Sequence, residues 1–340
     1  NFVLKIMNKS IAITVLTWND WKNTIVCLES IFQNTYQNFD VVLVNNGSEK
    51  YHIEKIRDWA SNKIIVEDEE IFFNENKKIE IIDTTNDYNI VSKGNKKIYL
   101  IDLENNIGLA PAINLGFKFS IENNYDLTAR IDCDFIITKN YLKSMSLLFV
   151  NDNNIIAASP KIKHAYLRDT IWWKGFKSNW SYLKFQKTMN LKKKRIMDDI
   201  KYKGINKTDA IAGCCSFYRT EVFKISGLED EDFEFGPEDA ELSFRLKKIG
   251  KLVVNLDTFT FHKIARSIDV SGWYYRSYNE TKGFLLLIKK TGTLSDKIFG
   301  YIYHILRVPY FLILLILKKR SKDLVKGYSK GCLDFFLGIK

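Results

Sequence analysis

Two carboxylates stand two residues apart, at Asp132 and Asp134, directly after the apolar run Leu127–Ile131. Side chains at positions i and i+2 of a strand project from the same face, about 7 Å apart along one edge. Like charges held that close repel each other, and a cation between them relieves the repulsion. The pair therefore predicts a site for a hard divalent ion that also grips a substrate diphosphate. By itself the pattern is weakly specific, because acidic residues often end strands.

A second acidic cluster follows about a hundred residues later, with Glu238, Asp239 and Glu241 after Pro237. Proline suits the first turn of a helix, and acids favour the positive end of the helix dipole, so helix capping explains part of this pattern. Capping does not explain the dense acids of residues 229–234 that come before it. We expect a carboxylate at this helix start to face the metal site and to act as a general base toward an acceptor hydroxyl.

The elements that must position these groups alternate between strands and helices. Residues 11–16, 39–44 and 97–103 are apolar runs with many β-branched residues, and helical apolar spacing fills the gaps between them. This rhythm predicts an α/β fold with a parallel sheet and right-handed crossovers. Ligands of such sheets bind beyond the carboxyl ends of the strands.

Small polar side chains follow the first two of these strands. Thr17 and Asn19 suit a base or ribose, as do Asn45 and Asn46, and Gly47 permits a positive φ. Each loop can also be a plain turn with a helix cap. The sequence has no Walker A motif and no G-x-G-x-x-G, so the metal at the paired aspartates must neutralise the phosphates.

The C-terminal region carries most of the basic charge. Of the net charge of +11, residues 282–340 supply +9, from 12 Lys and Arg against three acids. These residues are interleaved with apolar ones, which indicates an anionic membrane surface and not nucleic acid. Residues 298–317 are long enough to span a bilayer, but Arg307 and Pro309 make spanning expensive. We expect helices that lie on the membrane, with burial in an oligomer interface as the alternative.

In order and spacing, these features resemble the family 2 glycosyltransferases, inverting enzymes of the GT-A fold that use nucleotide sugars. The resemblance covers residues 11–262 and adds Asn105-Asn106-Ile107-Gly108, Asn114-Leu115-Gly116 and His262 to the motifs already described. It implies a Rossmann-like, mostly parallel sheet flanked by helices. It also implies that Asp132 and Asp134 bind the donor diphosphate through Mn²⁺ or Mg²⁺, that His262 contributes to this metal, and that Asp239 is the base.

The chemistry of the residues and the resemblance together indicate the substrate contacts, with aromatic core packing as the alternative for Trp172 and Trp173. The donor residues are Thr17, Asn19, Asn45, Asn46, Asn106, Gly108, Asn114, Asp132 and Arg276, and the acceptor residues are Trp172, Trp173 and Glu238. Relatives usually carry Asp where Asn45 stands and contact the base with it, so Asn45 bears on nucleotide choice, for which we expect UDP or dTDP. Residues 273–279 resemble a segment of bacterial rhamnosyltransferases and related enzymes that build surface polysaccharides.

The leading hypothesis is an enzyme, a metal-dependent hexosyl- or deoxyhexosyltransferase acting on a carbohydrate that is carried on a lipid. The alternative is a non-catalytic membrane-surface protein that binds nucleotide without turnover. We interpret residues 1–6 as a vector-derived remnant, 7–270 as the glycosyltransferase domain with an inserted hairpin or mobile flap at 68–96, and 271–340 as the helical extension. Five cysteines without a C-x-x-C favour the cytoplasm, at the inner face of the cell membrane.

Overall fold

The computed structural model describes most of the chain, namely residues 9–66, 68, 78–90, 92–176, 196–234, 236–263, 266–317 and 321–339. Residues 1–6, interpreted from the sequence as vector-derived, lie outside the described residues, and so do residues 69–77 of the predicted insertion.

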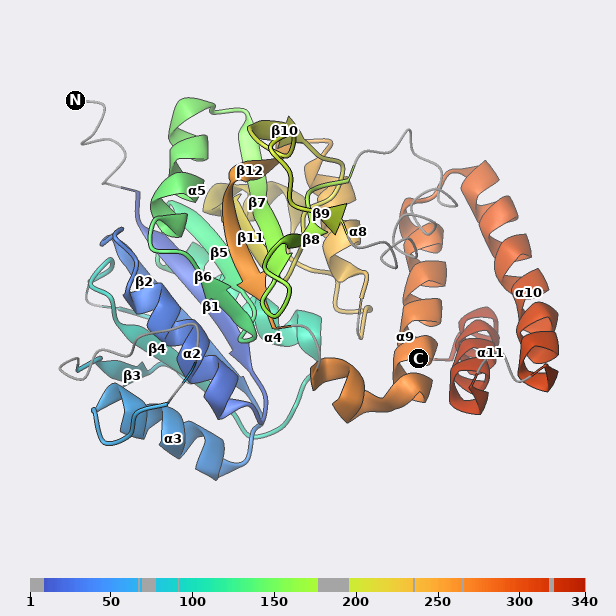
Figure 1. Cartoon of the computed structure of the whole chain (residues 1–340), viewed down its shortest axis with the longest axis horizontal. Helices are drawn as coiled ribbons and strands as arrows, with labels where there is room; N and C mark the ends of the chain where they lie inside the picture. Colours follow the sequence, from blue (N-terminus) through green and yellow to red (C-terminus); the bar gives the residue numbers. More distant parts are fainter. Residues whose placement is uncertain are drawn as a thin grey trace.

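One central sheet runs through the molecule in the strand order β10-β12-β7-β11-β5-β1-β2-β4-β3 (Figure 1). Three further strands join it, β6 beside β12 and the pair β8 and β9 beside β7. The strands are β1 (Ile11–Thr17), β2 (Phe39–Asn46), β3 (Ile81–Asp83), β4 (Ile98–Leu103), β5 (Leu127–Ile131), β6 (Phe135–Ile137), β7 (Ile155–His164), β8 (Thr170–Trp173), β9 (Ile196–Met197), β10 (Ile205–Lys207), β11 (Cys215–Arg219) and β12 (Lys251–His262).

The N-terminal half of this sheet is parallel and the C-terminal half is mixed. Strands β3, β4, β2, β1 and β5 pair in parallel, whereas β11 runs antiparallel to both β5 and β7. All eight residues of β2 are buried, as expected for a strand covered on both faces. The α/β class predicted from the sequence is confirmed. The insertion expected at 68–96 is not only a hairpin or flap, because its residues Ile81–Asp83 form the edge strand β3 along β4.

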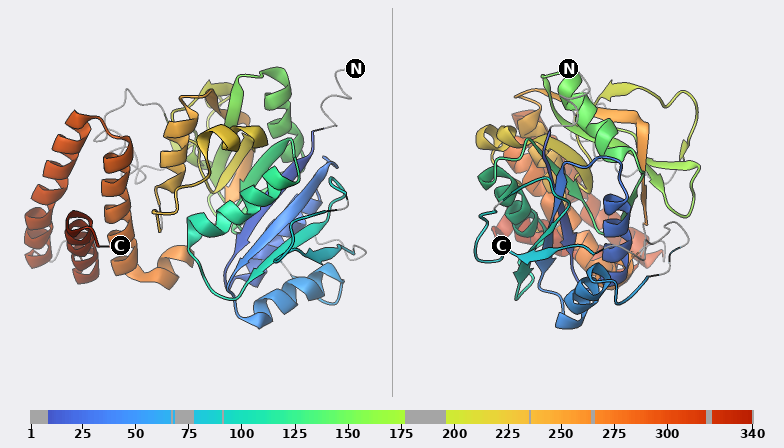
Figure 2. Two further views of the ribbon diagram at one scale, coloured as in Figure 1. Left: turned by 180° about the vertical axis from the view of Figure 1, so that it is seen from behind. Right: turned by 90° about the vertical axis from the view of Figure 1, so that its left-hand side faces the viewer.

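Helices cover both faces of the sheet (Figure 2). They are α2 (Trp21–Phe32), α3 (Lys50–Ala60), α4 (Leu109–Glu122), α5 (Tyr141–Asn151), α7 (Phe223–Ser226) and α8 (Glu238–Leu246). Successive residues of β1 face opposite sides of the sheet and belong to two separate apolar clusters. Ile13 and Val15 share one cluster with α2, α3 and α5, whereas Ala12 shares the other with α4. Helix α4 approaches β1 closely at Gly116, where a Cβ would lie 2.3 Å from Thr14 Cγ2.

Three helices follow the sheet domain and stand beside it (Figure 1). They are α9 (Arg266–Thr291), which Gly272 interrupts with a φ of 70°, then α10 (Leu294–Ile316) and α11 (Lys322–Leu337). Helix α11 lies directly on α9, because a Cβ at Gly327 would stand 2.3 Å from the Tyr274 carbonyl oxygen. Leu285 and Ile288 of α9 share a buried apolar cluster with both other helices.

Of the helices in the described part of the chain, α10 is the one that is long and apolar enough to cross a membrane, judged by length and composition. It is loosely covered, since 17% of its most apolar window is buried. Arg307 points away from the exposed face, with its guanidinium 4.7 Å from the ring centroid of Phe311 and 5.5 Å from that of Tyr328.

Candidate active site

The paired aspartates lie on a turn and not on a strand. Strand β5 ends at Ile131, and the Phe135 amide donates to the carbonyl oxygen of Asp132 at 3.1 Å, which closes the turn into β6. The expectation that Asp132 and Asp134 share one strand face is therefore wrong. The turn still keeps the two carboxylates within electrostatic reach: burial raises the pKa of Asp132, Arg130 lowers it, and Asp134 raises it.

Asp134 faces His262, the last residue of β12. The two side chains approach to 3.1 Å between Asp134 Oδ2 and His262 Nε2. Pairing of β6 with β12 places Phe135 opposite His262, and the two rings stack with centroids 4.4 Å apart. Trp172 meets the same imidazole edge-on at 4.8 Å. The aromatic packing therefore fixes the imidazole beside the Asp134 carboxylate.

This pair fits a divalent metal that shares its ligands with a substrate. Bonds of about 2.0–2.2 Å place neighbouring octahedral ligands about 3 Å apart, close to the 3.1 Å between Asp134 Oδ2 and His262 Nε2. In the described part of the chain, no three His, Cys, Asp or Glu side chains are grouped to hold a metal. Two protein ligands leave open positions that phosphate oxygens can fill.

Arg130 links this region to the second acidic cluster. Its buried side chain leaves β5 and donates from Nε to Asp132 Oδ1 at 2.9 Å and from Nη1 to Glu229 Oε1 at 3.0 Å. Glu238 Oε1 lies 3.7 Å from the same Nη1. Burial alone would lower the pKa of Arg130, but Asp132, Glu229 and Glu238 raise it well above its usual value. The guanidinium thus remains charged and joins three acidic side chains.

Glu238 and Asp239 begin α8 but differ in environment. Asp239 is half-buried and accepts from the Gly213 amide at 3.0 Å and from the Ala240 amide at 2.7 Å. Glu238 is 5% exposed, and burial, with Asp239 and Glu229 nearby, raises its pKa. A Cβ at Gly213 would lie 2.7 Å from Asp239 Cβ, so only glycine allows this approach. Of the two acids, Asp239 is the more accessible, so it is the better candidate for a base that meets an acceptor hydroxyl.

Several of the predicted donor residues use their polar side-chain atoms in hydrogen bonds within the protein. Thr17 is 1% exposed and its hydroxyl meets Thr24 Oγ1 at 2.7 Å. The Asn45 amide donates to Asp102 Oδ1 at 2.6 Å, and its oxygen accepts from the Ser48 amide. In this structure the polar groups of Thr17 and Asn45 are therefore buried and bonded within the protein, and their contact with the donor stays a prediction.

The side chain of Asn114 is likewise hydrogen-bonded within the protein. It is 2% exposed, and its amide donates to the Glu229 carbonyl oxygen at 2.8 Å and to Glu231 Oε1 at 3.0 Å. Its oxygen accepts from the Glu229 amide. Asn114 therefore holds the chain at Glu229, and its contact with the donor stays a prediction.

The remaining predicted donor residues lie in or beside the loops at the carboxyl ends of the parallel strands. Asn46 is buried and donates to Asn106 Oδ1 at 3.1 Å and to the Gly108 carbonyl oxygen at 3.0 Å, so it orders the loop before α4. Its contact with the donor stays a prediction. Asn106 is exposed at this loop, and Gly108 has a φ of 95° at the start of α4. Exposed Asn19 accepts from the Glu49 amide and so connects the loops that follow β1 and β2.

Comparison with known proteins agrees with this geometry. Residues 12–86 match the family model described as glycosyl transferase family 2. The match places this N-terminal segment of the chain in the family. Among solved structures, the chain is similar to GalNAc-T7, described with UDP, GalNAc and Mn²⁺, at a TM-score of 0.58 and 15% identity over 97% of this chain and 56% of that one. No curated protein sequence matches it closely enough to count as a relative.

Two further solved structures share the fold. A mannosyltransferase from Pyrobaculum calidifontis, described in complex with GDP-Man and Mn²⁺, has a TM-score of 0.55 at 11% identity, covering 98% of this chain and 88% of that one. S. aureus TarS has a TM-score of 0.50 at 15% identity, covering 89% of this chain and 43% of that one. The chain thus spans about half the length of GalNAc-T7 and TarS. The GT-A fold expected for the family is confirmed.

The other predicted substrate residues of this glycosyltransferase lie around its edge. Arg276 is on α9 and donates to Glu280 Oε1 at 2.8 Å. Trp173 donates to Ser159 Oγ at 3.2 Å and packs partly into the core, whereas Trp172 packs on His262. For Trp172, Trp173 and Arg276, the substrate contacts remain predictions.

Sequence reasoning missed Arg130, Glu229 and Asp102. Arg130 is a lone charge within the apolar run of β5, and such a residue needs a buried partner, so the strand held a usable signal. Glu229 was one acid among many in residues 229–234. Asp102 is the next-to-last residue of β4 and pairs in register with Asn45, which only the strand pairing reveals.

Proposed function

We propose that this family 2 glycosyltransferase moves a hexosyl or deoxyhexosyl unit from a nucleotide diphosphate sugar to a carbohydrate hydroxyl, with inversion at the anomeric carbon. One observation carries the proposal. Buried Arg130 joins Asp132, beside the Asp134–His262 pair, to Glu229 and Glu238, beside Asp239. Groups suited to hold a diphosphate and a group suited to activate a nucleophile therefore share one sheet edge.

In this mechanism Asp239 accepts the proton of the acceptor hydroxyl. The hydroxyl oxygen bonds to the anomeric carbon as the bond from that carbon to the diphosphate breaks on the opposite face. The Gly213 and Ala240 amides hold the Asp239 carboxylate in place. Asp134 and His262, with Asp132 beside them, would hold Mn²⁺ or Mg²⁺, which when bound neutralises the charge developing on the diphosphate.

The donor carries UDP or dTDP. Support comes from GalNAc-T7, whose structure is described with UDP and Mn²⁺, while the mannosyltransferase is described with GDP-Man. Asp102 accepts from Asn45 at the ends of β4 and β2, so the edge presents a carboxylate that can accept an N–H of uracil, thymine or guanine.

A panel of nucleotide sugars tests the function. Wild-type protein with Mn²⁺ should hydrolyse or transfer from a small subset of UDP-, dTDP- and GDP-sugars and should be thermally stabilised by the same subset. Asp134→Ala should lose both responses, whereas Cys133→Ser, in the same turn, should keep them. Stabilisation by nucleotide without turnover of any donor, over a range of carbohydrate acceptors, would favour the non-catalytic alternative.

The exposed face of α10 supports a place at the membrane. One stripe at helical spacing is half-exposed or more and consists of Phe299, Ile302, Leu306, Tyr310, Ile313 and Leu317. Helices that combine such a face with many basic residues bind anionic bilayers. We place the enzyme on the cytoplasmic face of the bacterial cell membrane, acting on a lipid-linked acceptor in surface polysaccharide synthesis. Contact with a second copy is the competing use of this face.

A further inference from the structure

The segment that carries Glu229 is dense in negative charge. Residues 229–234, which we call the acidic strap, have the sequence Glu-Asp-Glu-Asp-Phe-Glu and lead toward Glu238 and Asp239. Five acids in six residues repel one another and also repel the carboxylates at the start of α8. The strap must therefore be held from outside to keep Glu229 on Arg130.

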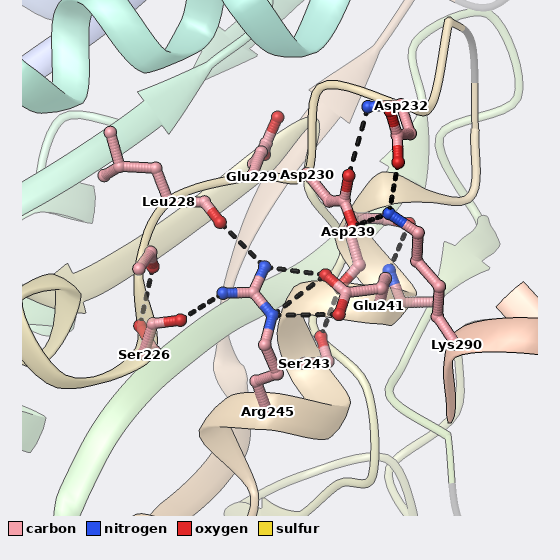
Figure 3. A network of polar contacts seen from close by, with 12 residues as sticks. Ser226, Leu228, Glu229, Asp230, Asp232, Asp239, Glu241, Ser243, Arg245 and Lys290 are labelled. Atoms are coloured by element: carbon pink, nitrogen blue, oxygen red, sulfur yellow. Dashed lines mark hydrogen bonds and ion pairs between the residues drawn. The ribbon is translucent and has the colours of Figure 1, made fainter. Parts of the chain in front are cut away.

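Two attachments come from the sheet domain itself. Arg245 of α8 donates to the carbonyl oxygens of Ser226 and Leu228 and pairs with Glu241, which anchors the chain just before the strap (Figure 3). Asn114 of α4 binds the backbone of Glu229 on both sides. These contacts fix the first strap residue, and Asn114 also donates to Glu231 Oε1 at 3.0 Å, which leaves Asp230, Asp232 and Glu234 to other elements.

The third attachment comes from α9. Lys290 Nζ pairs with Asp230 and lies 2.7 Å from Asp232 Oδ2, so one ammonium bridges two acids of the strap (Figure 3). The same ammonium stands 5.7 Å from the ring centroid of Phe233, and Lys282, two turns earlier, lies 3.5 Å from Glu234. Helix α9 therefore neutralises the strap along its length.

Apolar packing fixes α9 against the same segment. Phe233 is 1% exposed and shares a buried cluster with Leu287 of α9 and Ala240 of α8. Helix α9 also touches the backbone just before α8, because a Cβ at Gly283 would lie 2.1 Å from the Gly236 carbonyl oxygen. The first helix of the C-terminal extension thus packs against both the acidic strap and the segment that leads into α8.

We propose that Lys290 is a positioning residue for transfer: it holds the acidic strap closed, so that Glu229 keeps Arg130 on Asp132 and Asp239 keeps its place. The proposal rests on the proposed function for its catalytic consequence, but the holding of the strap can be measured without any substrate. It also means that the C-terminal extension completes the catalytic site and does not serve the membrane alone.

Hydrogen exchange tests the holding. Lys290→Ala should speed exchange of the strap amides, Glu229 included, by about fivefold to tenfold, because the remaining acids are no longer neutralised. Lys290→Arg should restore slow exchange. Lys289→Ala, on the exposed neighbouring position of α9, is the matched control and should leave the strap unchanged. Equal exchange in Lys290→Ala and wild type would overturn the proposal.

Kinetics with a donor found in the nucleotide-sugar panel tests the catalytic consequence. Lys290→Ala should lower kcat about tenfold and leave the KM for that donor within about twofold, since Lys290 bonds to the strap and to none of the predicted donor residues. Asp230→Ala with Asp232→Ala removes what Lys290 holds, so adding Lys290→Ala should then change kcat little. Two results would contradict a positioning role: a change in KM without a change in kcat for Lys290→Ala, or losses in kcat that add when all three substitutions are combined. If wild type transfers nothing, the proposed function fails while the exchange result still stands.

Discussion

Arg130 and Glu229 form an ion pair buried from solvent, with 3.0 Å between Nη1 and Oε1 and 99 residues between them in the chain. The pair joins a central strand to the acidic strap, and the same guanidinium binds Asp132. Buried charge of this kind costs stability unless every member is paired, so the cluster is retained where its geometry matters. That geometry brings the metal-side turn and the base-bearing helix together.

Removing the Arg130 charge should destabilise the protein strongly. Arg130→Met leaves Glu229 and Asp132 buried without their partner, so we expect a loss of about 3–5 kcal/mol in the free energy of unfolding, measured with urea. Lys9→Ala breaks a half-exposed pair with Asp126 and should cost less than about 1 kcal/mol. Similar losses of unfolding free energy in both variants would show that the buried Arg130 cluster contributes no more to stability than an exposed ion pair.

The base assignment distinguishes two neighbouring acids. Asp239→Asn should lower kcat by about 10²–10⁴ while nucleotide affinity persists, because proton acceptance is lost and the side chain keeps its size. Glu238→Gln should have a much smaller effect on kcat, since Glu238 is buried and its pKa is raised. Steady-state kinetics on both variants decide the matter. A large loss for Glu238→Gln with near-normal Asp239→Asn would reverse the roles.

The proposed metal ligands can be tested by the affinity for Mn²⁺ as well as by the rate of transfer. Asp134→Ala and His262→Ala should each weaken Mn²⁺ binding in the presence of UDP by tenfold or more, to judge by the usual cost of losing a ligand or its support. Titration calorimetry measures this directly, with Cys133→Ser as the control. Unchanged Mn²⁺ affinity in both variants, or full transfer in chelator, would remove the metal from the mechanism.

Stability should depend on pH through Glu238. Burial, with Asp239 and Glu229 nearby, raises its pKa from 4.5 to about 8, so the folded protein keeps a proton that the unfolded chain releases. The contribution to stability is fully present below pH 4.5 and is lost as pH rises through about 8, with a slope of up to about 1.4 kcal/mol per pH unit.

Glu238→Gln should flatten this part of the pH profile, because the amide cannot ionise. Urea unfolding at several pH values between 5 and 8 measures the slope, and Glu54→Gln, at an exposed position of α3, serves as the control. If Glu238→Gln kept the wild-type slope of unfolding free energy against pH, another group would be the one that retains the proton.

Membrane binding should depend on the exposed stripe of α10. Leu306→Glu with Ile313→Glu should release the protein from vesicles of anionic lipid and leave transfer to a soluble acceptor intact. Ile225→Glu, a 73% exposed isoleucine of α7, is the control. Substitution is the cleaner test, because truncation would uncover Leu285 and Ile288 on α9. A change from dimer to monomer with unchanged vesicle binding would assign the stripe to a second copy.

The sequence by itself determined the parallel half of the fold and the place of the site. Strand β2 is a buried apolar run, and such runs with helical segments between them specify parallel pairing locally. The polar residues after each run then had to meet at one edge. This is why Asp134 could be named as a candidate site residue without coordinates, whereas Asp239, at the start of α8, was named from the resemblance to the family.

Tertiary structure alone decided which polar groups are free. Asn45, Asn46 and Asn114 look alike in sequence, yet each is occupied by a partner 57 or more residues away. The contact of Arg130 with Glu229 and of Lys290 with Asp232 likewise joins residues 99 and 58 positions apart. Burial and hydrogen-bond saturation are properties of such long-range pairs, and no local pattern of residues encodes them.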